Sequence, residues 1–141
     1  MELVIVESPF KPGPGTPAER VAELRRNITY ARRALRDCFK RNEAPFASHL
    51  LYTQDGVLDD ENPEERALGI EAGLLWAQGA RKSVVYVDLG VSDGMCKGIT
   101  RAQREQRIVE FRTLENMSAD SMSKIVDDLL ARNVIQVRPT Y

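Results

Sequence analysis

Apolar residues along the chain follow two different spacings. Short runs rich in valine and isoleucine are typical of buried strands, and longer stretches with an apolar residue every three or four positions are typical of helices. The strand-like runs are residues 3–6, 45–52, 84–87, 107–111 and 134–137, and the helix-like stretches begin at Thr16, Asn62, Ser92 and Ser118. Because the two kinds alternate, the pattern predicts a mainly parallel sheet with helices packed on it.

The residues at the helix starts support this interpretation. Thr16 is a suitable cap, Pro17 fits the first helical position, and Glu19 completes a capping box. Asn62 and Glu65 give a similar signature before the next helix. With 141 residues and no internal repeat, the chain has the length of one domain. We therefore expect a single domain over residues 1–141, an α/β three-layer sandwich.

The stretch 83–103 combines a strand, a tight loop and a helix. The apolar run ends at Asp88, Gly90 lies in the loop, and Ser92 is a plausible cap, with Asp93 adding negative charge in the first turn. Gly94 leaves the backbone N–H groups of the helix start uncovered. Ligands of open α/β sheets bind beside such loops, so we expect a phosphate, carboxylate or sugar hydroxyl here. A well-capped turn without a ligand is the alternative.

Polar residues also follow the first strand-like run and lie in the second one. Adjacent parallel strands would bring both groups to the same carboxyl edge of the sheet as Asp88 and Ser92. The predicted ligand-binding residues are Glu7, Ser8, Pro9, Phe10, Asn27, His49, Asp88, Ser92, Asp93, Gly94 and Met95. Glu71, between two glycines, is the candidate catalytic carboxylate. His49 and Glu71 also have plain alternatives, a structural histidine and a surface glutamate.

Composition narrows the function classes. The formal net charge is −1, which does not favour a nucleic-acid or membrane surface. No apolar run approaches the roughly 20 residues that cross a bilayer. Cys38 and Cys96 lack the local spacing of a metal or redox motif and fit a reducing compartment. We expect a cytoplasmic protein that uses no metal or cofactor and binds neither DNA, RNA nor membranes.

Several motifs together resemble the nucleoside 2-deoxyribosyltransferase-like group of small Rossmann-like proteins, and most closely a branch found in bacteria and phages. The matching pieces are VIVESPF at 4–10, Asn27 with YARRA at 30–34, APFASHLL at 44–51 and VVYVDLGVSDGMCKGITRAQ at 84–103. The resemblance implies a Rossmann-like fold with a nucleoside or nucleotide pocket at the carboxyl edge of the sheet.

The resemblance also implies a chemistry for that pocket. In transferases of the group, a glutamate a few residues into the helix attacks the anomeric carbon of the sugar and forms a covalent glycosyl intermediate. In this sequence the start Ser92 to Met95 matches, but the position of the glutamate holds Gly98. Glu71, Glu7 or Asp88 could supply the carboxylate from another element.

Two function hypotheses follow. The first is a binding protein that holds a nucleoside or a nucleotide signal without turnover, as a phage-type sequestering protein would. The second is an enzyme that cleaves or transfers an N-glycosidic bond, a deoxyribosyltransferase or nucleoside hydrolase. The glycine at position 98 favours binding, whereas the acids Glu7, Asp59, Asp60, Glu71 and Asp88 favour an enzyme. The group's habit of self-association predicts a homo-oligomer, with Trp76 or Tyr52 at the contact; a purely structural subunit is a third alternative.

Overall fold

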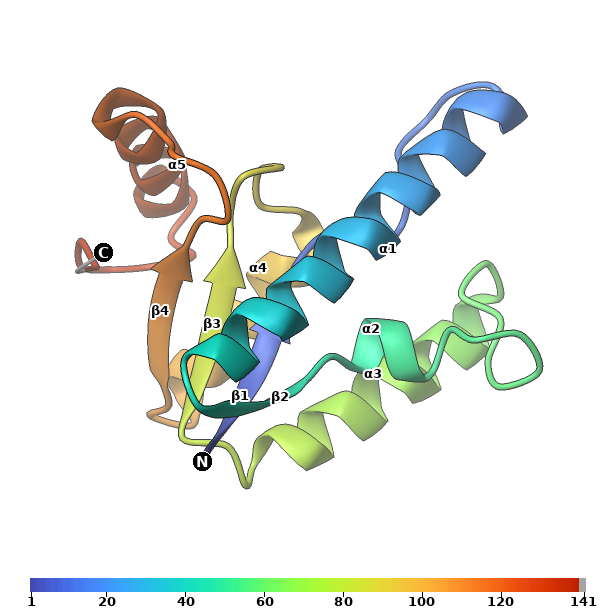
Figure 1. Ribbon diagram of the computed structural model, residues 1–141, viewed down its shortest axis with the longest axis horizontal. Helices are drawn as coiled ribbons and strands as arrows, with labels where there is room; N and C mark the ends of the chain where they lie inside the picture. Colours follow the sequence, from blue (N-terminus) through green and yellow to red (C-terminus); the bar gives the residue numbers. More distant parts are fainter. Residues whose placement is uncertain (140–141) are drawn as a thin grey trace.

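The computed structural model describes residues 1–139, which form four strands and five helices (Figure 1). The strands are β1 (Glu2–Glu7), β2 (Glu43–Phe46), β3 (Lys82–Tyr86) and β4 (Ile108–Arg112). The helices are α1 (Pro17–Lys40), α2 (Ser48–Leu51), α3 (Pro63–Ala77), α4 (Asp93–Arg104) and α5 (Ala119–Ala131). Within these residues, no helix combines the length and the apolar character needed to cross a membrane.

The four strands form one parallel sheet in the order β2-β1-β3-β4. This confirms the predicted Rossmann-like α/β class and the pairing of the first and third strands, with Val6 opposite Val84. The chain leaves β1 toward one edge of the sheet and later returns past it to form β3 on the other side. The strand order therefore reverses between β1 and β3, which is where open α/β sheets bind ligands.

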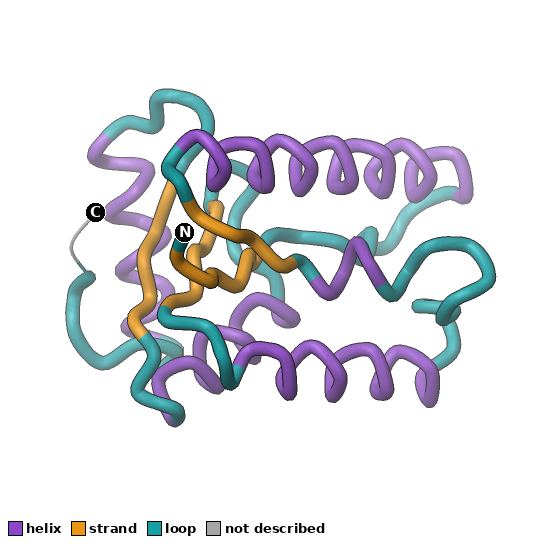
Figure 2. The backbone as a smooth tube through the Cα atoms, turned by 60° about the horizontal axis from the view of Figure 1, so that its bottom comes forward, coloured by secondary structure: helices purple, strands orange, loops and turns teal. Residues whose placement is uncertain are grey.

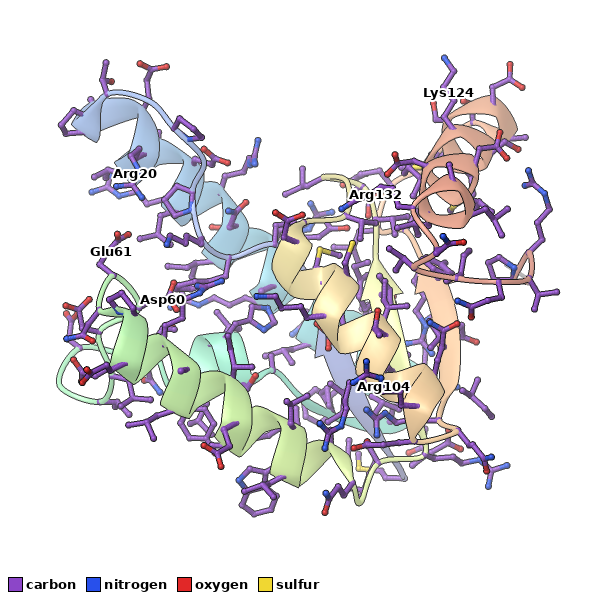
Figure 3. The ribbon with its side chains drawn as sticks, turned by 180° about the vertical axis from the view of Figure 1, so that it is seen from behind. Arg20, Asp60, Glu61, Arg104, Lys124 and Arg132 are labelled. Carbon is purple, nitrogen blue, oxygen red and sulfur yellow. The ribbon has the colours of Figure 1, made fainter. Side chains whose placement is uncertain are left out.

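Helices cover both faces of the sheet. Figure 2 shows α1 and α3 along opposite sides of the strands, and Figure 3 shows α4 on the same side as α3. One core cluster joins α1 to the sheet through Val4, Val6, Tyr30, Val84 and Tyr86. A second cluster lies on the α4 side and includes α5; its members include Val85, Val87, Met95, Ile99, Phe111 and Val126. The alternation of β3 between the two clusters explains why its sequence is continuously apolar.

The predicted helix caps are present. Thr16 Oγ1 accepts a hydrogen bond from Glu19 N and Thr16 N donates to the Glu19 carboxylate, so the capping box is complete. Asn62 Oδ1 accepts from Glu64 N and Glu65 N at the start of α3. These bonds satisfy backbone donors that have no partner inside the helix.

Two predicted strands differ from the structure. The run 45–52 is expected to be a strand that runs into a loop, but pairing ends at Phe46 and residues 48–51 form the single turn α2, with Leu50 N and Leu51 N donating to Ala47 O. The expected strand at 134–137 is also wrong, because these described residues form bends and irregular backbone after α5. Val134 and Ile135 are buried against the α4–α5 cluster, so their apolar character reflects helix packing rather than sheet pairing.

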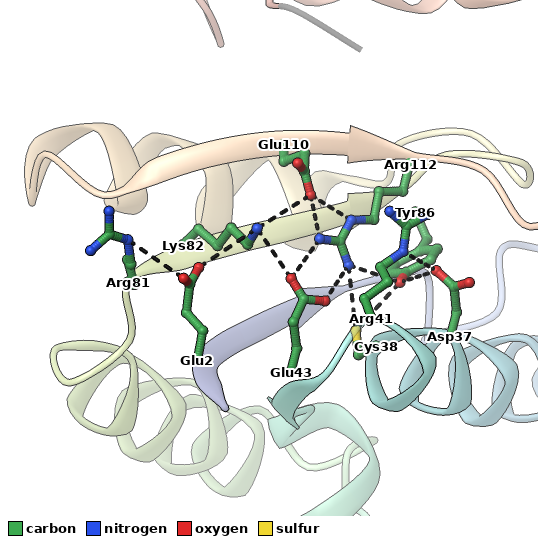
Figure 4. Close-up of polar contacts among 10 residues, drawn as sticks. All are labelled: Glu2, Asp37, Cys38, Arg41, Glu43, Arg81, Lys82, Tyr86, Glu110 and Arg112. Carbon is green, nitrogen blue, oxygen red and sulfur yellow. Dashed lines mark hydrogen bonds and ion pairs between the residues drawn. The ribbon is translucent and has the colours of Figure 1, made fainter.

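A network of charged side chains joins the two edge strands of the sheet (Figure 4). Arg112 on β4 makes two hydrogen bonds of 2.7 Å to the Glu43 carboxylate on β2, and both side chains are buried. Lys82 Nζ lies 3.1 Å from Glu43, and Tyr86 donates to Asp37 at 2.8 Å. The bidentate geometry fixes how α1, β2 and β4 meet on this face.

Candidate functional site

A cavity of about 510 Å³ opens at the carboxyl end of β1, between α3 and α4. The residues around it fall into a polar group from the end of β1, α2 and the start of α4, and an apolar group from β2, α3 and the loops after β1 and α2. The polar group includes Glu7, Ser8, His49, Ser92, Asp93, Gly94 and Lys97, and the apolar group includes Phe10, Phe46, Tyr52, Leu58, Ile70 and Leu74. The cavity thus lies beside the point where the strand order reverses.

Glu7 reaches the cavity because of the alternation along β1. Val4 and Val6 point toward α1, so Ile5 and Glu7 point to the opposite face and form part of the cavity wall. The accessible surface of Glu7 faces the cavity, yet the protein around its carboxyl group removes most of the surrounding water. This desolvation raises the pKa of Glu7 to about 8, against a smaller opposing effect of Arg107. Glu7 is therefore protonated at neutral pH and can donate a hydrogen bond.

Gly98 makes room for this carboxyl group. A Cβ atom at position 98 would lie 2.5 Å from Glu7 Cδ and would overlap the carboxylate oxygens. The Glu7 carboxyl group from β1 therefore fills the space that a side chain at position 98 of α4 would occupy. A carboxyl group is present beside the α4 start although position 98 itself cannot supply one.

Ser8 and His49 form a hydrogen-bonded pair next to Glu7. Ser8 Oγ lies 2.7 Å from His49 Nε2, and both residues line the cavity. Burial lowers the pKa of His49 to about 4, so the ring is neutral at physiological pH. The Phe10 and His49 rings pack in a T-shaped arrangement, with 6.1 Å between their centroids. The pair offers uncharged hydrogen-bonding atoms to a ligand.

The start of α4 forms the opposite side of the polar group. Ser92 Oγ accepts a hydrogen bond from Met95 N at 3.3 Å, as the sequence predicts for a cap. A Cβ atom at Gly94 would lie 3.8 Å from Arg66 Nη2, so the Arg66 guanidinium faces the helix start. Asp60 holds this guanidinium through Arg66 Nη1 at 2.7 Å. Helix N–H groups and an arginine on one wall suit an anionic or hydroxyl-rich ligand.

Aromatic side chains form much of the remaining wall. The Phe46 ring packs against Tyr52 at 6.3 Å and against Trp76 at 5.8 Å between centroids. Phe10, Phe46 and Tyr52 all line the cavity. A planar heterocycle can pack on such rings while its polar edge meets Ser8 and His49.

Loops extend the cavity beyond the sheet. A second hollow of about 450 Å³ shares Phe10, Pro12, Thr53, Leu58, Asp60 and Glu65 with the first. Arg20 on α1 forms an ion pair of 3.2 Å with Glu61, in the loop before α3 (Figure 3). This ion pair joins the two elements that frame the outer hollow.

The structure brings most of the predicted site residues together. Glu7, Ser8, Phe10, His49, Ser92, Asp93, Gly94 and Met95 line the cavity. Pro9 is buried next to them in the chain but is not part of the lining. Glu71 is exposed and also lies outside the lining, whereas the two glycines beside it in the chain, Gly69 and Gly73, face the cavity.

Asn27 and Asp88 have partners on the α1 side of the sheet. Asn27 is buried and donates from Nδ2 to Phe10 O at 2.9 Å, which anchors the chain after β1. Asp88 accepts from Tyr30 at 2.5 Å and from the backbone N–H groups of Leu114 and Glu115. Burial alone would raise the pKa of Asp88, but these hydrogen bonds hold it below its usual value. The two side chains position loops around the site.

Several lining residues were not predicted from the sequence. Arg66, Lys97, Lys11, Phe46 and Tyr52 all line the cavity. The position of Lys97 one turn into α4 gave a signal, because it follows Gly94 by three residues on the same side of the helix. No sequence signal identifies Arg66, because its approach to Gly94 depends on how α3 packs. Within the described part of the chain, no group of three histidine, cysteine or acidic side chains is arranged to hold a metal ion.

Comparison with known proteins gives a family but no activity. Neither a curated protein nor a solved structure matches the chain. One family model, described as a domain of unknown function (DUF7768), matches residues 2–112, from the start of β1 to the end of β4. The match includes all four strands, α4 and the cavity residues described above, and the chain therefore belongs to the DUF7768 family.

Proposed function

We propose that this protein binds a nucleoside or nucleotide in the cavity between α3 and α4. The observation that carries the proposal is the division of the cavity wall into an aromatic part and a hydrogen-bonding part at the carboxyl edge of the sheet. Phe10, Phe46 and Tyr52 would pack on the base. Ser8 and His49 would read its polar edge or the sugar, and the α4 start with Arg66 and Lys97 would take hydroxyl or phosphate oxygens.

The protonation state of Glu7 favours binding without turnover. Cleavage of an N-glycosidic bond through a glycosyl intermediate needs an ionised carboxylate against the anomeric carbon. With a pKa of about 8, Glu7 is largely neutral at pH 7 and serves as a hydrogen-bond donor. Exchange of bases between a deoxynucleoside and a free base should therefore be weak or absent at neutral pH.

Calorimetric titration and melting curves test the binding proposal. The ligands are adenosine and adenosine 5′-monophosphate, their guanine, cytosine and uracil counterparts, and the deoxy forms. A ligand present at about one hundred times its dissociation constant should stabilise the fold by roughly 2.7 kcal/mol. If none of these compounds gives a heat of binding or a melting shift, the proposal is contradicted.

Matched variants locate the binding site. Ser92 caps α4 in the cavity, and Ser118 caps α5 outside the cavity lining, where its Oγ accepts from Ser121 N. Ser92→Ala and Ser118→Ala should each cost about 1 kcal/mol of stability. Only Ser92→Ala should also weaken ligand binding. Gly94→Val should abolish binding, because its methyl groups would enter the cavity beside Arg66. Unchanged affinity in both cavity variants would place the ligand elsewhere.

The second candidate is an enzyme acting on an N-glycosidic bond, and the position of Glu7 beside Gly98 favours it. Here Glu7 would be the nucleophile that the α4 position lacks. Incubation of a deoxynucleoside with a second base, followed by chromatography, separates the two candidates. A Glu7 nucleophile predicts exchange that rises with pH through about 8 and disappears in Glu7→Gln. Rapid exchange at neutral pH would contradict the binding proposal.

The proposal also covers location and assembly, and for assembly we expect a homo-oligomer, as the resemblance to the nucleoside 2-deoxyribosyltransferase-like group implies. Both cysteines are free and buried in the structure, which agrees with a reducing compartment, and we place the protein in the cytoplasm. Its partner in this proposal is a small molecule rather than DNA, RNA or a membrane.

A further inference from the structure

The cavity has an inner end to which the proposed function assigns no role. Ile5 lies two residues before Glu7 on β1, so this part of the cavity is about 7 Å deeper than the carboxyl end of the strand. Phe46 is the partner of Ile5 in the register of β1 and β2, so both side chains face the same side of the sheet. Ala77, the last residue of α3, and Arg107, just before β4, also line the cavity, and both are buried. The inner end is thus an apolar space that borders one buried guanidinium group.

The Arg107 guanidinium group is held in place but has donors to spare. Its Nε donates to Ser83 Oγ at 3.0 Å, and its Nη1 donates to Ala77 O at 3.0 Å and to the Glu105 carboxylate at 2.6 Å. Among the described residues, none accepts a hydrogen bond from Nη2. The side chain is only 4% exposed, yet every fully buried side-chain nitrogen or oxygen in the described part of the chain has a partner, so Nη2 keeps some accessible surface. Because Arg107 lines the cavity, a ligand there can accept a hydrogen bond from Nη2.

Charges around the inner end favour a hydrogen-bond acceptor on the ligand. Arg101 and Arg107 share the Glu105 carboxylate, each at 2.6 Å, so two positive charges face one negative charge. Glu7 adds no charge at neutral pH, because its raised pKa keeps it protonated. A protonated carboxyl group both donates and accepts, whereas a guanidinium group only donates. The choice between ligand groups at this end therefore depends on Arg107.

A nucleic-acid base suits the inner end better than a phosphate does. The faces of a heterocycle are apolar and can pack against Ile5, Phe46 and Ala77, whereas a phosphate would lose much of its hydration there. The start of α4, at the carboxyl edge, offers the helix N–H groups that suit a phosphate. With the base inside, the Ser8 and His49 pair at that edge would meet the sugar.

We infer, building on the proposed function, that the protein selects bases with an oxo group, namely guanine, hypoxanthine and uracil, and that Arg107 determines this selection through a hydrogen bond from Nη2 to the oxo oxygen. Adenine and cytosine carry an amino group at the same position, and its N–H donors would face the donors of Arg107. A buried donor without an acceptor costs free energy, so the amino bases should bind more weakly. The protonated Glu7 carboxyl group would accept either kind of base.

Calorimetric titration with matched pairs of nucleosides tests this inference. Inosine and adenosine differ at position 6 of the purine, as do guanosine and 2,6-diaminopurine riboside, and uridine and cytidine differ at position 4 of the pyrimidine. We expect the oxo member of each pair to bind about tenfold more tightly or better. Equal affinities within the pairs, or tighter binding of the amino members, would overturn the inference and leave the binding proposal intact. If none of the six binds, both are contradicted.

Matched arginine variants test the assignment to Arg107. Arg107→Lys keeps the positive charge but removes Nη2, and it should abolish the difference within each pair. Arg101→Lys is the control, because Arg101 also bonds to Glu105 but lies outside the cavity lining, and it should keep the difference. The ratio of two affinities is the readout, since a merely loosened fold would weaken both members of a pair. A preference that survives in Arg107→Lys, or that disappears in both variants, would overturn the role of Arg107. Circular dichroism checks folding, and the pairs measured on the natural chain decide the base preference even if Arg107→Lys does not fold.

Discussion

At the scale of single residues, Glu7 and Gly98 form the most informative pair in the site. The resemblance to nucleoside 2-deoxyribosyltransferases draws attention to the missing glutamate on α4. The fold places a carboxyl group from β1 in the space that the glycine leaves. Sequence reasoning could name Glu7 as one of several replacement acids, but it could not select Glu7, because the contact joins residues 91 positions apart.

Ionisation of Glu7 should make stability depend on pH. The folded chain keeps the Glu7 proton up to about pH 8, whereas the unfolded chain loses it near the usual pKa of 4.5. The contribution of Glu7 is therefore fully present below pH 4.5 and is lost as the pH rises to about 8, by an amount on the order of a few kcal/mol. Melting curves should show this loss for the natural chain and a smaller one for Glu7→Gln. Parallel pH profiles would contradict the raised pKa.

Gly98→Ala should mainly change the pKa of Glu7 and should have a smaller effect on the stability of the fold. The new Cβ atom would overlap the end of the Glu7 side chain, which can rotate into the cavity and regain water. We expect the pKa of Glu7 to fall toward its usual value, measured by carboxyl carbon shifts in a pH titration. Gly94→Ala is the control, because its Cβ atom would meet no atom closer than 3.8 Å. A Glu7 pKa that stays near 8 in Gly98→Ala would show that the two positions are not in contact.

At the scale of elements, the sheet is held by polar contacts as well as by its apolar core. Arg112 and Glu43 connect the edge strands, and their hydrogen bonds lower the pKa of the Glu43 carboxyl. Removing Glu43 takes the bidentate carboxylate away from buried Arg112 and leaves the more exposed Glu110 as its remaining carboxylate partner. Breaking such a buried pair typically costs about 3–5 kcal/mol.

Glu43→Gln should therefore destabilise the chain by about 3 kcal/mol, measured by urea unfolding. Asp128→Asn removes an exposed ion pair with Arg132 on α5 and should cost less than about 1 kcal/mol. Because the folded pKa of Glu43 is lowered, its stabilising effect is present at neutral pH and is lost as the pH falls below 4.5. Equal effects of the two substitutions would show that the Arg112 pair contributes no more than a surface pair.

The elements themselves were largely predictable, and the exceptions have physical causes. Capping residues and apolar periodicity identified α1, α3, α4 and α5, because both signals act within a few residues. The runs 45–52 and 134–137 have the composition of strands, yet a strand needs a partner with free hydrogen-bonding groups. In residues 48–51 the backbone bonds to itself in a helical turn, and residues 134–137 pack on helices. Local sequence does not contain that information.

The cavity shows the same division between local and long-range information. The α4 start and the end of β1 were predictable as one edge of a parallel sheet, and eight predicted residues do line the cavity. Arg66, Phe46 and Tyr52 were not predicted, because their positions depend on how α2 and α3 fold back over the sheet. The reversal of strand order between β1 and β3 explains why a site lies at this point of the sheet.

At the scale of the whole molecule, packing is uneven around the sheet. On α1, five residues are buried, and on the twelve-residue α4 four are, Met95, Cys96, Ile99 and Ala102. On the fifteen-residue α3 only Gly73 and Ala77 are buried, since this helix faces the cavity on its inner side. The free energy of local opening follows the amount of buried apolar contact. Helix α3 should therefore open more easily than α4.

Native-state hydrogen exchange tests this expectation. Amides of α3 should exchange before those of α4 in the free protein, although α3 is the longer helix. Adenosine 5′-monophosphate, or whichever nucleotide gives the largest melting shift, should then slow exchange in α3 more than in α5, because the ligand would bridge α3 and α4 across the cavity. The Gly94→Val variant should lose this selective protection while keeping the exchange pattern of the free protein. Equal protection of α3 and α4 without ligand would contradict this expectation.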